Sequence, residues 1–197
     1  MKTFEEYEEL AAKAHGHMCA GQVLGLRMAI RGLELLGIDD PAGRDRKRLV
    51  TYVEIDRCAT DAISVVTGCR LGKRALKFLD FGKMAATFVD LQTGRAVRIA
   101  ARESSKQRAG ELFPEIEDRN RQQMTAYRRM SAPELFDLQW VKLTVGPEEM
   151  PGFKGARVTC GECGEGISFR REVEREGRTL CRACAGGRYY EPLPDHG

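Results

Sequence analysis

Two histidines and a cysteine alternate near the start of the chain, in the stretch HGHMC at residues 15–19. Imidazole nitrogen and thiolate sulfur are ligands that zinc and other transition metals prefer. Residues two apart in an extended segment point to one side, so His15, His17 and Cys19 could project toward one ion. A helix beginning at about Ala20 would place its N-terminal N–H groups beside Cys19 and favour the thiolate. This stretch therefore predicts half of a metal site.

A second group of candidate ligands follows a predicted strand, in the stretch DRCATD at residues 56–61. Cys58 and Asp61 are three residues apart and would share one face of the first turn of a helix. Together the two groups offer N, S and O ligands, and an incomplete protein shell would leave room for water or substrate, as in catalytic zinc sites. A second interpretation stays open, in which the cysteines are small buried residues and the histidines are structural groups.

The strongest metal signal lies near the end of the sequence. Four thiolates can surround a zinc ion tetrahedrally at about 2.3 Å each. Because four thiolates leave no open coordination position, we expect a structural zinc that folds a segment too short to build its own core, and no catalysis there. A hairpin with its turn at residues 176–177 is expected between two C-x2-C pairs, which are Cys160, Cys163, Cys181 and Cys184.

Periodicity and turn residues predict a mixture of helices and strands. A linker rich in glycine and proline follows at residues 146–156. Helices mixed with at least one hairpin indicate an α+β domain rather than an all-parallel one. The expected elements are helices over 3–14, 20–36, 59–68 and 103–130 (interrupted at Pro114), a short helix at 131–134, strands over 48–55 and 138–145, and a hairpin turning at Thr93-Gly94.

The composition is that of a soluble globular protein, with 42% apolar residues, 31% charged residues and a net charge of +3. This charge does not by itself favour nucleic acid as a partner, and no run approaches the ~20 apolar residues of a membrane span. The acidic N-terminus lacks the apolar core of a secretory signal, so we expect a cytoplasmic protein. Its seven cysteines are then expected to be metal ligands and free thiols rather than disulfides.

The arginines and tyrosines of residues 182–190 leave open whether the cysteine-rich tail contacts a partner subunit, the main domain or nucleic acid.

The segments HGHMCAGQVLGLRMA (15–29) and DRCATDAISVVTGC (56–69), followed by the four-cysteine tail, resemble the FmdE family, which is named after one of the subunits of formylmethanofuran dehydrogenase. The resemblance implies an FmdE-like core over residues 1–145 with a mixed β-sheet flanked by helices, loosely thioredoxin-like. A linker (146–156) and a treble-clef-type four-cysteine zinc finger (157–197) would follow. Many members have proline where this chain has Ala20, which should alter the local turn more than the ligands.

The same resemblance implies a second metal, by expectation Zn²⁺, in the core. Its site residues would be His17, Cys19 and Cys58, with His15 and Asp61 close by. It also implies a homodimer and a link to the other subunits of the molybdenum or tungsten enzyme of methanogenesis. The chain lacks the cysteines of an iron–sulfur relay, so we do not expect the dehydrogenase catalytic subunit itself.

Whether the chain is an enzyme or an accessory subunit stays open at this point. One alternative is a non-enzymatic metal carrier or sensor that uses the His/Cys site, with the finger as its docking module. Another is a thiol–disulfide protein that uses Cys19 and Cys58, which ranks lower because the core has no C-x-x-C motif.

Overall fold

A computed structural model of the chain describes residues 1–191 and 193. The chain divides into two compact units, residues 1–144 and 145–197. We describe each unit by itself.

Unit 1 is built around a mixed five-stranded sheet with the strand order β2-β1-β3-β4-β5. Strands β1 and β2 run parallel, and all other neighbours are antiparallel. This arrangement confirms the expected α+β class. The elements are α1 (Phe4–His15), α2 (Ala20–Leu36), β1 (Leu49–Val53), α3 (Cys58–Thr67), η1 (Leu71–Lys73), β2 (Leu76–Phe78), β3 (Ala85–Asp90), β4 (Ala96–Ala101), α4 (Ser104–Leu112), α5 (Arg119–Arg129), α6 (Ala132–Leu135) and β5 (Phe136–Val141).

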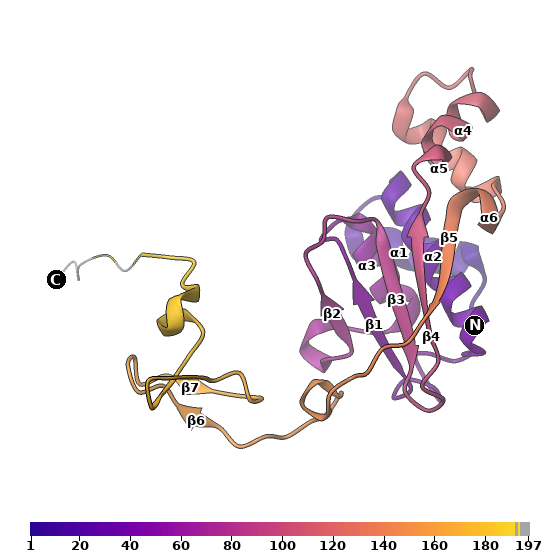
Figure 1. Cartoon of the computed structure of the whole chain (residues 1–197). Helices are drawn as coiled ribbons and strands as arrows, with labels where there is room; N and C mark the ends of the chain where they lie inside the picture. Colours follow the sequence, from indigo (N-terminus) through magenta and orange to yellow (C-terminus); the bar gives the residue numbers. More distant parts are fainter. Residues whose placement is uncertain (192, 194–197) are drawn as a thin grey trace. The chain divides into compact units, whose positions relative to one another are not determined.

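Helices α1, α2 and α3 cover one face of the sheet, behind the strands in the view of Figure 1. Helix α2 packs across β3 and β4, and α3 packs against β1. The largest buried side chains of this layer include Leu26 and Leu33 from α2 and Phe88 and Ile99 from the sheet. Their burial is the main source of stability for the unit, since apolar area removed from water contributes about 25 cal/mol per Å².

The corner between α1 and α2 is defined by local sequence signals. Thr3 and Glu6 form a capping box that begins α1. Gly16 ends the helix in the left-handed conformation, with φ of 93°. Because His15 is the last residue of α1, the expectation that residues 15–19 form one extended segment is wrong. The chain turns at Gly16 and enters α2 at Ala20.

Two strands differ from the expectation. The last strand of the sheet covers Phe136–Val141 rather than 138–145, because α6 begins at the capping box of Ser131 and ends at Leu135, and the chain is extended from Phe136 onward. Strand β2 was not expected at all. It has only three residues, too few for a periodic pattern, and it forms by pairing in parallel with β1.

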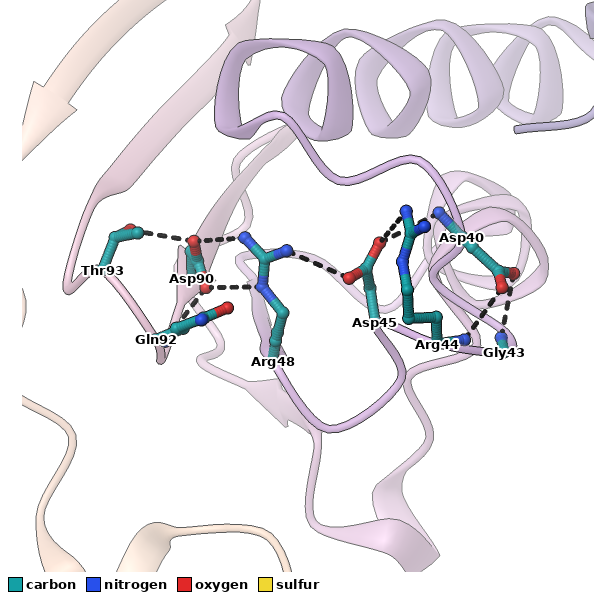
Figure 2. A network of polar contacts seen from close by, with 8 residues as sticks. All are labelled: Asp40, Gly43, Arg44, Asp45, Arg48, Asp90, Gln92 and Thr93. Carbon is teal, nitrogen blue, oxygen red and sulfur yellow. Dashed lines mark hydrogen bonds and ion pairs between the residues drawn. The ribbon is translucent and has the colours of Figure 1, made fainter.

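Polar contacts join the loop before β1 to the hairpin between β3 and β4, as Figure 2 shows. The Arg48 guanidinium lies between two carboxylates, 3.0 Å from Asp45 and 2.8 Å from Asp90. Asp90 also accepts from the Gln92 N–H and the Thr93 hydroxyl. Burial by itself would raise the pKa of Asp90, but these hydrogen bonds outweigh it and hold that pKa below its ordinary value. The network fixes the end of the sheet where β1 begins.

Unit 2 consists of two small hairpins and a helical turn. Among its described residues, the apolar core consists of the buried Cys160, Ile167 and Leu180 with a few partly buried neighbours, far too little to fold a segment of this length without a metal. As expected, the second hairpin turns at Glu176 and Gly177, which both have positive φ. The elements are η2 (Pro147–Glu149), β6 (Val158–Thr159), β7 (Gly166–Ile167), β8 (Val173–Arg175), β9 (Arg178–Leu180) and η3 (Ala183–Gly187).

The first cysteine pair lies between β6 and β7, and the second lies at the start of η3. A knuckle, a hairpin and a helical turn in this order match the expected treble-clef type of finger. Residues 192 and 194–197 of the expected finger lie outside the part of the chain that is described.

Candidate metal centre

The side chains of His15, His17 and Cys19 converge at the corner between α1 and α2. One ligand atom from each lies within 4.8 Å of the others. The imidazole rings of His15 and His17 are 4.8 Å apart between centroids. The helix end at His15 and the left-handed Gly16 turn the chain so that these side chains meet, in place of the extended geometry expected from the sequence.

Cys19 is the N-cap residue of α2, and its side chain caps no backbone N–H. The N-terminus of a helix carries partial positive charge, which favours an anion such as a thiolate beside it. Of the N–H groups there, that of Ala20 is taken by the Asn120 side chain of α5, at 2.9 Å. Helix α5 is held in turn by Arg27 of α2, which donates to three carbonyls at its end.

Cys58 is the first residue of α3 and lies beside Cys19. A side chain at Gly21 would contact both residues, with its Cβ 3.4 Å from Cys58 Cβ and 3.8 Å from Cys19 Sγ. Cys58 is not part of the three-residue group whose ligand atoms are all within 4.8 Å of one another. Burial and the neighbouring Cys19 thiol raise the pKa of Cys58, which favours the protonated form of that thiol.

Asp61, one turn into α3, contacts His15. Its Oδ2 atom is 2.8 Å from Nδ1 of the imidazole. The His15 side chain is 18% exposed, whereas Asp61 is 61% exposed. A carboxylate bonded to one ring nitrogen fixes the tautomer and orientation of the ring, which leaves Nε2 as the nitrogen available to a metal.

A pocket of about 510 Å³ opens beside these residues. It is lined by His15, Cys58 and Asp61, by Thr60 of the first turn of α3, and by Asp56 and Arg57 of the loop into that helix. Asp56 and Arg57 are exposed, so the pocket has charged groups of both signs at its mouth. A small polar molecule could reach an ion held at the corner through this opening.

Three residues that support the site were not found from the sequence. Gly25 of α2 faces the backbone of Ala59 of α3 so closely that a Cβ there would overlap it. Gln22 is fully buried and donates to the Cys58 carbonyl at 3.0 Å. Gln22 could have been found from the sequence, because a polar residue on the apolar face of a helix indicates a buried hydrogen bond. Asn120 gave no such signal, because it is a hundred residues from its partner in sequence.

The donor set fits a transition metal. Imidazole nitrogen and thiolate sulfur suit zinc, copper, nickel or iron rather than magnesium or calcium. Ligands in a tetrahedral zinc site lie about 3.3–3.8 Å apart, given metal–ligand distances of about 2.0–2.3 Å. Separations up to 4.8 Å therefore need only small side-chain movements for His15, His17 and Cys19 to close on one ion.

The four cysteines of unit 2 form a second group, with all their sulfur atoms within 4.8 Å of one another. The sulfurs of Cys163 and Cys181 are 3.9 Å apart, close to the separation in a tetrahedral four-thiolate zinc site. Backbone N–H groups of Cys163, Cys181 and Glu162 lower the pKa of Cys160 to about 6, which prepares that sulfur as an anionic ligand.

Cys69 takes no part in either group. It is 2% exposed, and its sulfur accepts from the Thr51 hydroxyl and donates to the Leu49 carbonyl. Burial raises the pKa of its thiol.

No helix among the described residues combines the length and the apolar character that crossing a membrane requires.

Comparisons with known proteins agree with this arrangement. A family described as FmdE, molybdenum formylmethanofuran dehydrogenase operon, matches residues 14–137. The prokaryotic dksA/traR C4-type zinc finger matches residues 155–190. The first match includes both core clusters, and the second includes all four finger cysteines.

A relative from Archaeoglobus fulgidus, described as a probable S-adenosyl-L-methionine-binding protein, is 33% identical over 202 residues. The alignment covers 91% of this chain and 52% of that protein, so the chain spans about half of its relative. A crystal structure of a tungsten formylmethanofuran dehydrogenase FmdE-like protein from Syntrophus aciditrophicus has the same fold, with a TM-score of 0.63 and 24% identity, and 96% of each chain is covered. The chain is a metal-binding member of the FmdE family with a C-terminal C4-type zinc finger.

Proposed function

We propose that the core of this protein holds one transition-metal ion, zinc by preference, at His15, His17, Cys19 and Cys58. In this proposal the chain serves as a metal-dependent accessory subunit of a formylmethanofuran dehydrogenase-type system. The convergence of three ligand atoms within 4.8 Å at the α1–α2 corner carries the proposal. Cys58 would complete the set by a small movement of its side chain from its place beside Cys19.

Each part of the site has a distinct role in this proposal. The two thiolates bind the ion from two helix N-termini, where negative charge is favoured. Asp61 orients His15 through its 2.8 Å contact and, being exposed, can pass a proton between the pocket and solvent. A metal at this place would supply Lewis-acid or water-activating chemistry to a molecule in the pocket.

Membership of the family supports an association with other subunits of such a complex. A homodimer is a further part of the proposal. The finger is proposed to hold a structural zinc at its four cysteines and to dock on protein rather than on nucleic acid.

A metal carrier is the second candidate, and the exposure of the site favours it. His17 is exposed and the pocket is open to solvent, so an ion there could exchange with a partner without unfolding of the core. Two thiolates and imidazole would select a soft or borderline ion.

Cobalt substitution tests the claim that both proposals share, which is that the core binds a metal ion. Co²⁺ bound at the core should give an absorption spectrum of mixed thiolate and imidazole ligation. This spectrum is obtained by subtracting the spectrum of a variant with Cys19→Ser and Cys58→Ser, which retains the finger. Identical spectra for the two proteins would rule out the core site.

Exchange kinetics then separate the candidates. A resident catalytic ion should leave slowly when a chelator is added, whereas a carried ion should leave within the mixing time. S-adenosyl-L-methionine belongs in the same titrations as an added ligand, because the A. fulgidus relative carries that description.

A further inference from the structure

Gln22 occupies an unusual place in the core. It belongs to the buried face of α2, where its neighbours Val23 and Leu26 are apolar and fully or almost fully buried. Its own side chain is 0% exposed. A glutamine rarely becomes fully buried unless its amide is hydrogen-bonded, so its contacts should explain its presence.

Only half of the Gln22 amide is satisfied within the described part of the chain. Nε2 donates to the Cys58 carbonyl at 3.0 Å, whereas Oε1 is buried and has no hydrogen-bond partner there. The bond to a carbonyl fixes which end of the amide is the nitrogen, because the oxygen in that position would face another acceptor. A half-satisfied buried amide costs stability relative to an apolar side chain of the same shape. Stability alone therefore does not account for this residue.

The satisfied half lies next to the metal site. The Cys58 carbonyl belongs to the residue whose sulfur lies beside Cys19, and Gln22 is only three positions after Cys19 on α2. Side chains of a helix lean toward its N-terminus, which directs Gln22 toward the end of α2 where Cys19 is the cap. The Gln22 side chain therefore connects the backbone of Cys58 to α2, the helix whose N-cap residue is Cys19.

Two glycines make this tie possible. Gly21 leaves room for Cys58, and Gly25 admits the Ala59 backbone against α2. They bring the first turns of α2 and α3 together but do not determine how α3 is rotated or shifted along α2. A hydrogen bond to the Cys58 carbonyl can fix that remaining freedom because it is directional.

We propose that Gln22 is a positioning residue of the core metal site, which holds Cys58 at the distance from Cys19 that one ion requires. This inference rests on the proposed metal site. Outer contacts of this kind typically change metal affinity by about 10- to 100-fold when they are removed.

Gln22→Met in the full chain tests the proposal, because methionine has a similar shape and no hydrogen bond. Gln122→Met is the matched control. Gln122 makes the same kind of bond, from Nε2 to the Phe113 carbonyl at 2.9 Å, but its partner lies outside the site. Co²⁺ affinity of the core is measured in both variants, together with the thiolate-to-cobalt absorption band and the melting temperature.

The expected result is a core affinity about 10- to 100-fold weaker in Gln22→Met, with an altered charge-transfer band and an unchanged or higher melting temperature. Gln122→Met should leave affinity and spectrum as in the original chain. Equal core affinity in the two variants would overturn the inference, and so would an affinity loss that only parallels a lower melting temperature. If Gln22→Met does not fold, Gln22→Asn replaces it, because asparagine keeps the amide but is too short to reach the Cys58 carbonyl. The same comparison of Co²⁺ affinity, absorption band and melting temperature with Gln122→Met then tests the inference.

A metal-free readout separates this inference from the proposed function. If the original chain binds no ion at the core, the metal site itself fails. Gln22 can still be judged from the rate at which Cys58 reacts with a thiol reagent, measured by mass spectrometry of the labelled peptide. A faster reaction in Gln22→Met than in Gln122→Met supports a positioning role, whereas equal rates contradict it.

Discussion

At the scale of single residues, the proposed core site depends on which atoms of the α1–α2 corner face a metal. His15 presents Nε2 because its Nδ1 is engaged by Asp61. Cys19 and Cys58 lie next to each other although 39 positions separate them in the sequence. A buried thiol without such neighbours, Cys69, is fully accounted for by its contacts with Thr51 and Leu49.

Asp61→Asn should weaken core metal binding by about 10-fold, because an amide orients His15 less strongly than a carboxylate and adds no charge. Equilibrium competition with a chelator of known affinity measures this effect. Asp56→Asn is the matched control, since Asp56 lines the same pocket but has no contact like that between Asp61 and His15. Equal affinities in the two variants would show that Asp61 does not act through His15.

At the scale of secondary structure, the site depends on the close approach of α2 and α3. Gly25 lies against the Ala59 backbone, and a methyl group there would push the two helices apart. Because each helix carries one of the cysteines at its start, their separation also sets the separation of the two sulfurs.

Gly25→Ala should lower the free energy of unfolding of unit 1 by about 1–3 kcal/mol and also weaken core metal binding. Gly32→Ala is the control, since a Cβ at Gly32 would overlap the buried ring of Phe88 instead, away from the site. Urea unfolding and metal titration of both variants check this prediction. Comparable instability with equal metal affinity would contradict a role for helix spacing in the site.

Acid should weaken unit 1 through the contacts of Arg48. The pKa values of Asp45 and Asp90 lie below the ordinary 3.8 in the folded protein. For Asp45, burial acts in the opposite sense and is outweighed, chiefly by hydrogen bonds from the Asp40 N–H and from Arg48. The unfolded chain therefore binds more protons, so the stability from these groups is complete above their ordinary pKa and is lost as the pH falls through the lower folded values.

Arg48→Met should make the free energy of unfolding less dependent on pH between about pH 5 and pH 2, because the folded pKa values rise toward the ordinary ones. Urea unfolding of the metal-free protein at several pH values measures this. An unchanged pH dependence would show that Arg48 does not hold these carboxylates ionised.

Helices and strands could be predicted from the sequence where local residues, such as a terminating glycine, define their ends. Helix α2 was expected over 20–36 and is found at Ala20–Leu36, because Gly37 provides an unambiguous stop. Strand β2 could not be predicted, since its three residues become a strand only by pairing with β1. The convergence of His15, His17 and Cys19 was expected for the wrong reason, as it comes from a helix end and a turn.

At the scale of the whole molecule, the chain combines two units that differ in whether their folding depends on a metal ion. Unit 1 has an extensive apolar core, so we expect it to fold without an ion. In the described part of unit 2 the core has three buried apolar residues, so we expect this unit to need a metal ion to fold. The spacing of the finger cysteines was sufficient to predict their grouping, whereas the role of Gln22 needed the packing of α2 on α3.

Cys160→Ser with Cys163→Ser should unfold unit 2 and leave unit 1 folded, because only the finger depends on four thiolates for its stability. Hydrogen exchange followed by mass spectrometry resolves the two units separately. Peptides of residues 145–191 should lose protection while those of α2 and β3 keep it. Loss of protection in both units would show that unit 1 does not fold independently of the finger.

The most direct test of the core metal site is the zinc content per chain of protein purified without oxygen. The original chain and the Cys69→Ser control should each contain two zinc ions, one in the finger and one in the core. The variant with Cys19→Ser and Cys58→Ser should contain one. One zinc ion in all three proteins, together with no uptake of added zinc or cobalt by the core, would contradict the account.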